Sequence, residues 1–150
     1  MISKYQLFSG SVACLYRAIQ KIERVEMARF GLKGPHAQCL LAISSHPKGL
    51  TAAQLCQLCE KDKAAISRIV SELEQAGLLR RGTPGSARYR APLTLTEQGQ
   101  EAAAQVNARA QQAVEQAGAG LTDAQREVFY QVLATIAGNL HTICREGLPD

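Results

Sequence analysis

The chain has 150 residues, 46% of them hydrophobic and 20% charged, and it carries a formal net charge of +4. That length suits one domain with its own core, or one small module with accessory helices, and the composition argues against a disordered chain. No apolar run approaches the ~20 residues of a membrane span, which excludes a transmembrane helix. Residues 1–95 hold fourteen Lys and Arg against six Asp and Glu, whereas residues 96–150 hold three against seven. This asymmetry permits a polyanionic partner.

The N-terminal segment MISKYQLFSGSV lacks the basic start and apolar block of a signal peptide, so we expect a cytoplasmic protein. An odd number of scattered cysteines in that compartment predicts free thiols instead of a disulfide framework. The cysteines are Cys14, Cys39, Cys56, Cys59 and Cys144.

Residues 4–30 are expected to form an amphipathic helix that is too long for a small three-helix core to cover. Its apolar positions are Leu7, Phe8, Val12, Leu15, Tyr16, Ile19, Ile22 and Met27. Residues 31–34 break this helix, and Pro35 is expected at the first position of a second one. The second helix has an apolar side and ends at residues 46–49.

A short third helix is expected to begin at Thr51, which forms a capping box with Gln54, and to run to about Glu60. After a tight turn, Asp62 and Gly77 are placed to start and end a fourth helix. One face of this helix is apolar, with Ala65, Ile66, Ile69, Val70 and Leu73. The other face is small and cationic, with Lys63, Ala64, Ser67, Arg68 and Ser71. Such a face suits either solvent or the major groove of DNA, and the two short helices indicate a helix-turn-helix.

Short strands are expected at residues 78–79 and 92–95, joined by a turn rich in Gly, Pro and Ser. Four arginines and no acid lie in this stretch: Arg80, Arg81, Arg88 and Arg90. The pattern predicts a β-hairpin with a basic tip, or wing. A solvated loop is the alternative, but the uncompensated arginines favour contact with phosphates or the minor groove.

Thr96 is expected to cap a fifth helix, whose mostly alanine seam requires close packing: Ala103, Val106, Ala110, Ala113, Val114 and Ala117. After a break at residues 118–120, Thr122 and Gln125 form another capping box that starts a last helix. That helix is amphipathic, with Val128, Phe129, Val132, Leu133, Ile136, Leu140 and Ile143.

The order of helix-turn-helix, basic wing and LTEQG resembles the MarR family of bacterial transcription regulators. The stretches LCQLCEKDKAAISRIVSELEQAGLLRR and LTLTEQG carry the resemblance most specifically, and LTDAQREVFYQVL resembles the family's C-terminal dimerisation helix. The resemblance implies a mainly α fold with a β-hairpin wing. Residues 31–95 would form a winged helix-turn-helix module, and residues 1–30 and 96–150 would form dimerisation helices. It further implies a homodimer that binds pseudo-palindromic DNA, usually as a repressor released by a ligand or by oxidation.

Residue by residue, the resemblance places Arg68 where relatives often keep an arginine for DNA. The expected DNA-binding set is Lys63, Ala64, Ser67, Arg68, Ser71, Arg81, Arg88 and Arg90. Relatives commonly carry Asp-x-Arg at the wing tip, but the acid is missing here. Counting back from Leu95 puts Tyr89 in the arginine slot, whereas one extra hairpin residue would put Arg88 there.

The Cys56-x-x-Cys59 pair invites a zinc or redox interpretation, with Cys39 and a histidine (His36 or His46) as candidate further ligands. No second paired motif exists and family members place apolar residues at these positions, so core packing with a raised pKa is favoured. Cys14 is the expected redox candidate, because peroxide-sensing relatives keep a reactive cysteine in the first helix. A packed thiol is the alternative there too. By analogy with the family, an effector pocket is expected near Leu15, Ile19, Leu40 and Val106.

Three other function classes fit the sequence less well. An enzyme is not expected, because no Gly-rich phosphate loop, paired His/Glu motif or G-x-S-x-G occurs. A protein–protein adaptor built on the winged-helix fold is disfavoured by the basic wing. A thiol-based redox regulator of the same fold is the third. No metal and no cofactor are predicted. The expected partners are double-stranded DNA, a second copy of the chain and a small-molecule effector.

Overall fold

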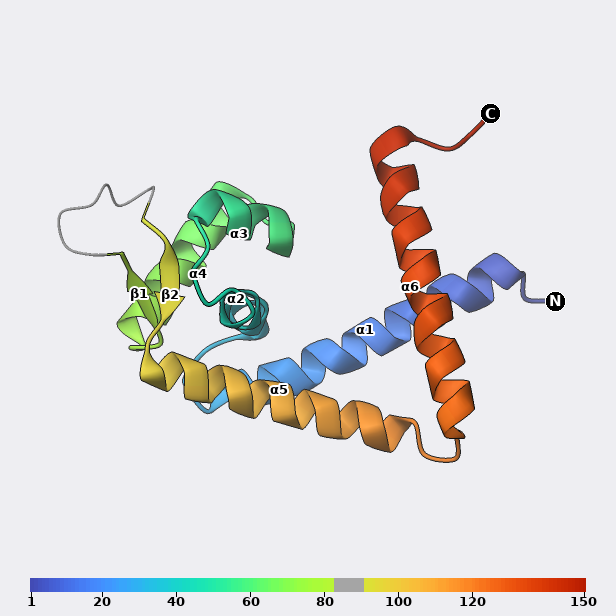
Figure 1. Cartoon of the computed structure of the whole chain (residues 1–150), viewed down its shortest axis with the longest axis horizontal. Coiled ribbons are helices and arrows are strands. Elements are labelled where there is room, and N and C mark those ends of the chain that lie inside the picture. The colour runs from blue at the N-terminus through green and yellow to red at the C-terminus, as the bar shows by residue number, and fades with distance from the viewer. Residues whose placement is uncertain (83–90) are drawn as a thin grey trace. The chain divides into compact units, whose positions relative to one another are not determined.

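The computed structural model describes residues 1–82 and 91–150 and forms two compact units, Met1–Gln112 and Ala113–Asp150 (Figure 1). The wing tip, residues 83–90, lies outside the described part of the chain. The elements, in chain order, are α1 (Lys4–Ala28), α2 (Gly34–Ser44), α3 (Ala52–Cys59), α4 (Lys63–Gln75), β1 (Leu79–Arg81), β2 (Leu93–Leu95), α5 (Glu97–Ala117) and α6 (Asp123–Glu146). The predicted fold class, mainly α with a β-hairpin, is confirmed.

Side-chain caps explain why most of these helices begin where they do. The capping boxes predicted at Thr51 and Thr122 are present, and a third, at Ser3, starts α1. At the start of α5 the Thr96 hydroxyl accepts a hydrogen bond from the Gly99 amide at 3.0 Å. Pro35 occupies the second position of α2, one later than expected, because Lys33 is the residue that precedes the first turn.

The core of the first unit lies where α2, α3, α4 and the hairpin meet. It contains the four buried apolar residues of α4, which are Ile66, Ile69, Val70 and Leu73. The end of α1 contributes Met27, and the first half of α5 contributes Ala102, Ala103 and Val106. Both long helices, α1 and α5, therefore contribute side chains to the core of the first unit.

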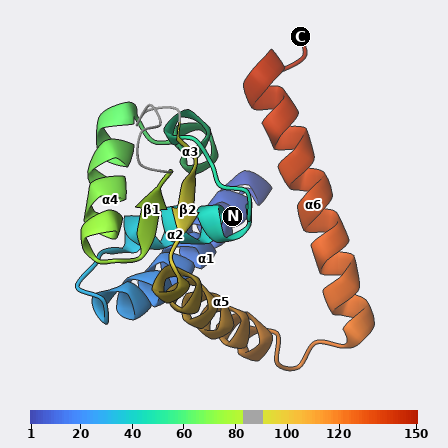
Figure 2. The ribbon, with the colours of Figure 1, turned by 60° about the vertical axis from the view of Figure 1, so that its left-hand side comes forward.

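The hairpin is antiparallel, with Leu79 opposite Leu95 and Arg81 opposite Leu93. Leu50, just before α3, adds one further bridge to Leu93, with N–O distances of 3.1 and 2.7 Å. The sequence offered no sign of this bridge. It ties β2 to the start of the helix-turn-helix, and both ribbon views show α4 beside β1 (Figure 2).

Two glycines permit the close packing where α4, β1 and α5 meet. Gly77 has a φ of +77°, which lets the chain leave α4 by a left-handed turn. At Gly99 a Cβ atom would lie only 1.9 Å from the carbonyl oxygen of Leu78. The first turn of α5 can therefore pass against the start of β1 only without a side chain at that position.

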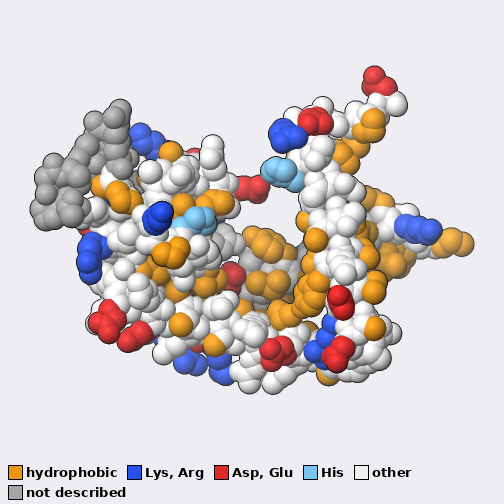
Figure 3. Space-filling view, in the orientation of Figure 1, with side chains coloured by type: hydrophobic (Ala, Val, Ile, Leu, Met, Phe, Trp, Pro, Cys, Tyr) orange, Lys and Arg blue, Asp and Glu red, His pale blue; other side chains and the backbone are white. Residues whose placement is uncertain are grey.

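Much of the apolar stripe of α1 and most of that of α6 are exposed within one chain (Figure 3). Exposed apolar residues of α1 include Leu7, Phe8, Val12, Leu15 and Ile19. No residue of α6, a helix described throughout its length, is buried. In the second unit, Arg126 donates a hydrogen bond to the Gly118 carbonyl at 2.8 Å. Across the described residues, no helix has both the length and the apolarity to cross a membrane.

Candidate nucleic-acid interface

The fourth helix is held at both ends by the residues that the sequence singled out. Asp62 accepts a hydrogen bond from the Ala65 amide at 2.7 Å. At the other end, the Leu78 amide bonds to the Leu73 carbonyl and the Gly77 amide to the Glu74 carbonyl, which is a Schellman motif. Together with the buried apolar face, these caps fix how α4 presents its other face.

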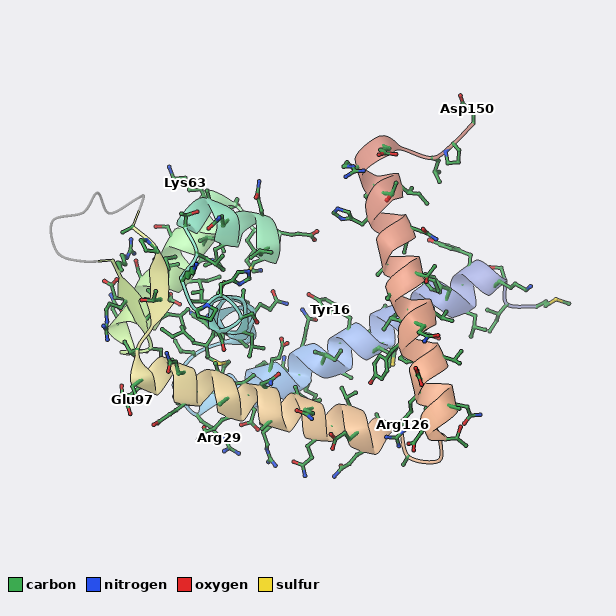
Figure 4. All side chains as sticks on the ribbon, viewed as in Figure 1. Tyr16, Arg29, Lys63, Glu97, Arg126 and Asp150 are labelled. Atoms are coloured by element: carbon green, nitrogen blue, oxygen red, sulfur yellow. The ribbon has the colours of Figure 1, made fainter. Side chains whose placement is uncertain are left out.

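That other face is open to solvent. Lys63, Ala64, Ser67 and Arg68 are exposed, whereas Ser71, which the sequence placed on the same face, is half-buried. Figure 4 shows the Lys63 side chain projecting outward from the start of α4. Small side chains between two cations leave room for a second surface to approach the helix backbone closely, which is what a major groove requires.

Arg81 has a counter-ion that the sequence analysis missed. Its Nε lies 2.9 Å from Glu74 Oε2, and its Nη2 donates to Ser71 Oγ at 3.3 Å. The wing stretch itself carries no acid, but α4 supplies one. This arrangement holds the Arg81 guanidinium, which is 28% exposed, against the same helix that carries Arg68.

A side-chain hydrogen bond connects α2 to α4. His36 is buried, and its Nε2 lies 2.5 Å from Glu72 Oε2. The other ring nitrogen, Nδ1, accepts a hydrogen bond from the Lys33 amide at 3.1 Å, so Nε2 is the nitrogen that donates to Glu72. Nothing in the sequence marked His36 and Glu72, which are 36 positions apart, as partners.

The wing arginines Arg88 and Arg90 lie outside the described residues, and so does the alternative between Tyr89 and Arg88 in the arginine slot. Their role in binding stays a prediction. Arg80, just before the undescribed segment, is exposed on β1.

Three cysteines gather where α2 meets α3. Cys39 is fully buried, and Cys56 and Cys59 are half-buried against the core, so both pack as expected. The expectation of a raised pKa is wrong for Cys59. A hydrogen bond from Cys39 Sγ at 3.7 Å and the charge of Lys61 outweigh partial burial and lower the pKa of Cys59 to about 7. The described residues contain no cluster of three or more metal-ligating side chains.

The residues expected at an effector pocket are dispersed. Leu40 and Val106 are fully buried in the core, whereas Leu15 and Ile19 are exposed on α1. A cavity of about 390 Å³ opens nearby, between α1 and the start of α2. The side chains lining it include Tyr16, Gln20, Glu23, Arg24, Lys33, Gln38 and Lys61. Partial burial raises the pKa of the Glu23 carboxyl there.

A second cavity, of about 440 Å³, lies between α1, α2 and the end of α3. Its lining includes Tyr16, Leu41, Leu58 and Cys59. Tyr16 and Gln38 line both cavities. The hydroxyl of Tyr16 accepts a hydrogen bond from Gln38 Nε2 at 3.1 Å. Cys14, the expected redox residue, is exposed on α1.

Comparison with known proteins gives one consistent result. Residues 30–88 match the model of the MarR family. A Thauera aromatica protein, named as a putative transcriptional regulatory protein for the hcr operon, is 27% identical over 129 residues. The match covers 86% of this chain and 75% of that protein.

Solved structures share the fold at low sequence identity. A MarR protein from Peptoclostridium difficile superposes with a TM-score of 0.79 at 20% identity, covering 95% of this chain and 94% of the other. The crystal structure of MarR superposes with a TM-score of 0.78 at 22% identity, covering 92% and 93%. Both likenesses extend beyond the helix-turn-helix into the long terminal helices.

Proposed function

Because the chain belongs to the MarR family of winged-helix transcriptional regulators, we propose that it is a homodimeric, sequence-specific repressor of double-stranded DNA. The observation that carries the proposal is the outer face of α4. Lys63, Ser67 and Arg68 are exposed there on a helix whose other face is locked into the core and whose two ends are capped. A rigid helix with small and cationic side chains outward is the element that enters a major groove.

The surrounding charges support the same orientation. Arg80 and Arg81 follow α4 directly, and the Glu74 and Ser71 contacts place Arg81 beside the α4 face. Arg88 and Arg90 extend the basic sequence toward the wing tip. Arg80, Arg88 and Arg90 would neutralise phosphates on either side of a groove, whereas the charge of Arg81 is already paired with Glu74. The outer face of α4 would supply the contacts to base edges.

The exposed apolar stripes support the homodimer. Leu7, Leu15, Leu133 and Leu140 are each 45% or more exposed in one chain. Monomeric proteins rarely leave that much apolar surface open, and a second copy would present matching stripes. Two copies related by a two-fold axis would also place two α4 helices against successive half-sites of a pseudo-palindrome.

Release of DNA by a small-molecule effector completes the proposal. The cavity of about 390 Å³ falls in the size range of ligand pockets, and it borders α2, which is tied to α4 through His36 and Glu72. Three cations, Arg24, Lys33 and Lys61, and one carboxylate, Glu23, line it. A small organic anion is therefore the class of effector that the lining favours.

The test is selection of bound fragments from the source genome, followed by a binding titration on the selected site. We expect an inverted repeat whose half-sites are centred about 10 base pairs apart. Arg68→Ala should weaken binding by about 1–3 kcal/mol without altering the fold. Arg145→Ala removes an equal charge from α6 and serves as the control. No enrichment of any sequence, or equal affinity for both variants, would contradict the proposal.

A further inference from the structure

We propose that Cys59 and Cys39 form an oxidisable thiol pair, in which a hydroperoxide entering the cavity beside α3 oxidises Cys59 and Cys39 then closes a disulfide between α3 and α2. The inference concerns the chemistry of the two thiols and needs no DNA. Only its consequence for gene regulation rests on the function proposed above.

The geometry of the pair is the first observation. Cys39 Sγ lies 3.7 Å from Cys59 Sγ, and Cys39 is completely buried while Cys59 is half-buried. Formation of an S–S bond of ~2.05 Å requires a closer approach of less than ~2 Å. Cys59 is the last residue of α3 and is followed by Glu60, which has a φ of +50°. The movement that brings the two sulfur atoms together would therefore occur at the end of α3, where the backbone can shift more easily than inside a helix.

Access is the second observation. Cys59 lines the cavity of about 440 Å³, together with Tyr16, Leu41 and Leu58. The cavity is open, and Leu58 at its edge is 54% exposed. A hydroperoxide with an apolar organic group could enter and meet the Cys59 sulfur, whereas Cys39 has no exposed surface and does not line the cavity. The two thiols therefore have different roles, with Cys59 attacking and Cys39 resolving.

Electrostatics supports the same division. The hydrogen bond from Cys39 and the nearby Lys61 stabilise the thiolate and lower the pKa of Cys59 to about 7. About half of Cys59 is then thiolate at neutral pH, against a few per cent for a thiol with an ordinary pKa of ~8.5. The hydrogen bond to Cys59, burial and the negative charge developing on Cys59 raise the pKa of Cys39, which keeps it protonated as the hydrogen-bond donor.

The chemistry balances with the hydroperoxide as the only oxidant. The Cys59 thiolate attacks the terminal peroxide oxygen, the O–O bond breaks, and the alkoxide leaves with a proton as an alcohol, giving a Cys59 sulfenic acid. Cys39 sulfur then attacks the Cys59 sulfur, the S–O bond breaks, and the Cys39 proton leaves with the hydroxide as water. The peroxide is reduced by two electrons, and the two thiols lose two hydrogens to become one disulfide.

The disulfide would change the turn that connects α3 to α4. Residues 60–62 alone separate Cys59 from the first residue of α4, and the Lys61 amide bonds back to the Cys56 carbonyl at 3.2 Å. Movement of the α3 end toward Cys39 would change this turn and so the start of the proposed recognition helix. If the function proposed above holds, oxidation alters DNA affinity. If it does not, the disulfide still forms.

The first experiment measures thiol reactivity against pH on the intact reduced protein. Iodoacetamide alkylation, followed residue by residue by mass spectrometry, should show a midpoint near pH 7 for Cys59. Cys39→Ala removes the hydrogen-bond donor and should move that midpoint upward, toward the ordinary ~8.5. Cys39→Ser keeps an O–H donor and should leave the midpoint low. A wild-type midpoint at or above ~8.5, or identical midpoints in both variants, would overturn the proposal.

The second experiment maps the product in the wild-type chain, so it does not depend on any variant folding. Treatment with cumene hydroperoxide should lower the chain mass by two hydrogens and link the Cys39 and Cys59 peptides in a non-reducing digest. Cys56→Ser should form the same link, whereas Cys39→Ser should accumulate a Cys59 sulfenic acid that dimedone traps. A link through Cys14, Cys56 or Cys144 instead, or a disulfide between two chains, would contradict the assignment.

Discussion

Arg109 in α5 reaches across to α1, where its Nε lies 3.2 Å from Oε1 of Glu26, a residue 83 positions earlier. The Glu26 carboxylate is almost fully buried, and its other oxygen lies 3.4 Å from Arg29 Nε. A buried carboxylate costs stability unless cations and hydrogen bonds compensate it. Arg109 thus joins α5 to the end of α1, and Arg29 adds a second cation from the C-cap of α1 itself.

Removing one of these arginines should leave the buried Glu26 carboxylate less well compensated and so destabilise the fold. We expect Arg109→Ala to lower the free energy of unfolding by about 1–2 kcal/mol, less than for a fully buried pair because Arg29 remains and Arg109 is itself half-exposed. Urea denaturation at fixed protein concentration measures this. Gln112→Ala, which removes only the exposed hydrogen bond from Arg109 at 3.3 Å, is the control and should change stability by less than about 0.5 kcal/mol. Equal effects of the two substitutions would contradict the assigned role.

Gly99→Ala should be among the most damaging single-methyl additions in the chain. The new Cβ would meet the Leu78 carbonyl at 1.9 Å, so α5 or β1 must move. The expected loss is about 1–3 kcal/mol or more, although alanine favours helices over glycine. Gly10→Ala in α1, where the chain offers no atom within 4 Å, is the matched control and should be neutral or stabilising. Thermal unfolding of both variants side by side decides the matter.

The proposed homodimer predicts that Leu133→Glu disrupts assembly. Leu133 belongs to the α6 stripe and is 45% exposed in one chain, so a charge there would be buried only if a partner covers it. Light scattering at ~10 μM should show a dimer for the wild type, because obligate interfaces of ~2,000 Å² or more rarely dissociate at that concentration. Leu148→Glu, outside α6, should remain dimeric. A stable wild-type monomer would refute the dimer.

The wing arginines are predicted to contact DNA phosphates or the minor groove. Replacing Arg88 or Arg90 by Ala should weaken specific and non-specific binding together and reduce the log–log salt dependence by ~1 unit for each arginine that neutralises a phosphate. Fluorescence anisotropy at several salt concentrations gives the slope. If only one position matters, that result identifies the arginine slot of the hairpin. Unchanged slopes for both variants would place the wing outside the complex.

Local sequence signals were sufficient to predict most helices. The apolar period of α4, the cap at Asp62 and the positive φ at Gly77 were all readable, because each depends on residues within one or two turns. The capping boxes at Thr51 and Thr122 were predicted for the same reason. Pro35 shows the limit of such signals. A proline is compatible with either of the first two helix positions, so the sequence did not reveal that α2 begins one residue earlier, at Gly34.

Contacts between distant residues could not be predicted in this way. The bridge from Leu50 to Leu93, the His36–Glu72 pair and the Arg81–Glu74 pair join residues from different elements, and only the packed structure brings them together. The thiols illustrate the consequence for chemistry. The spacing of Cys56 and Cys59 drew attention to the wrong pair, whereas the partner of Cys59 is Cys39, which lies 20 positions away.

The uncovered α6 has a consequence for how the molecule would respond to dilution. Since no residue of this fully described helix is buried in its own chain, its helicity depends on a covering surface, because propensity alone stabilises a helix poorly. The first unit has its own core, so in the proposed homodimer it would keep its fold when the two chains separate. A chain dissociated from the proposed homodimer would therefore keep a folded winged helix-turn-helix module while α6 unwinds. Loss of ellipticity on dilution would then report separation of the subunits and not global denaturation.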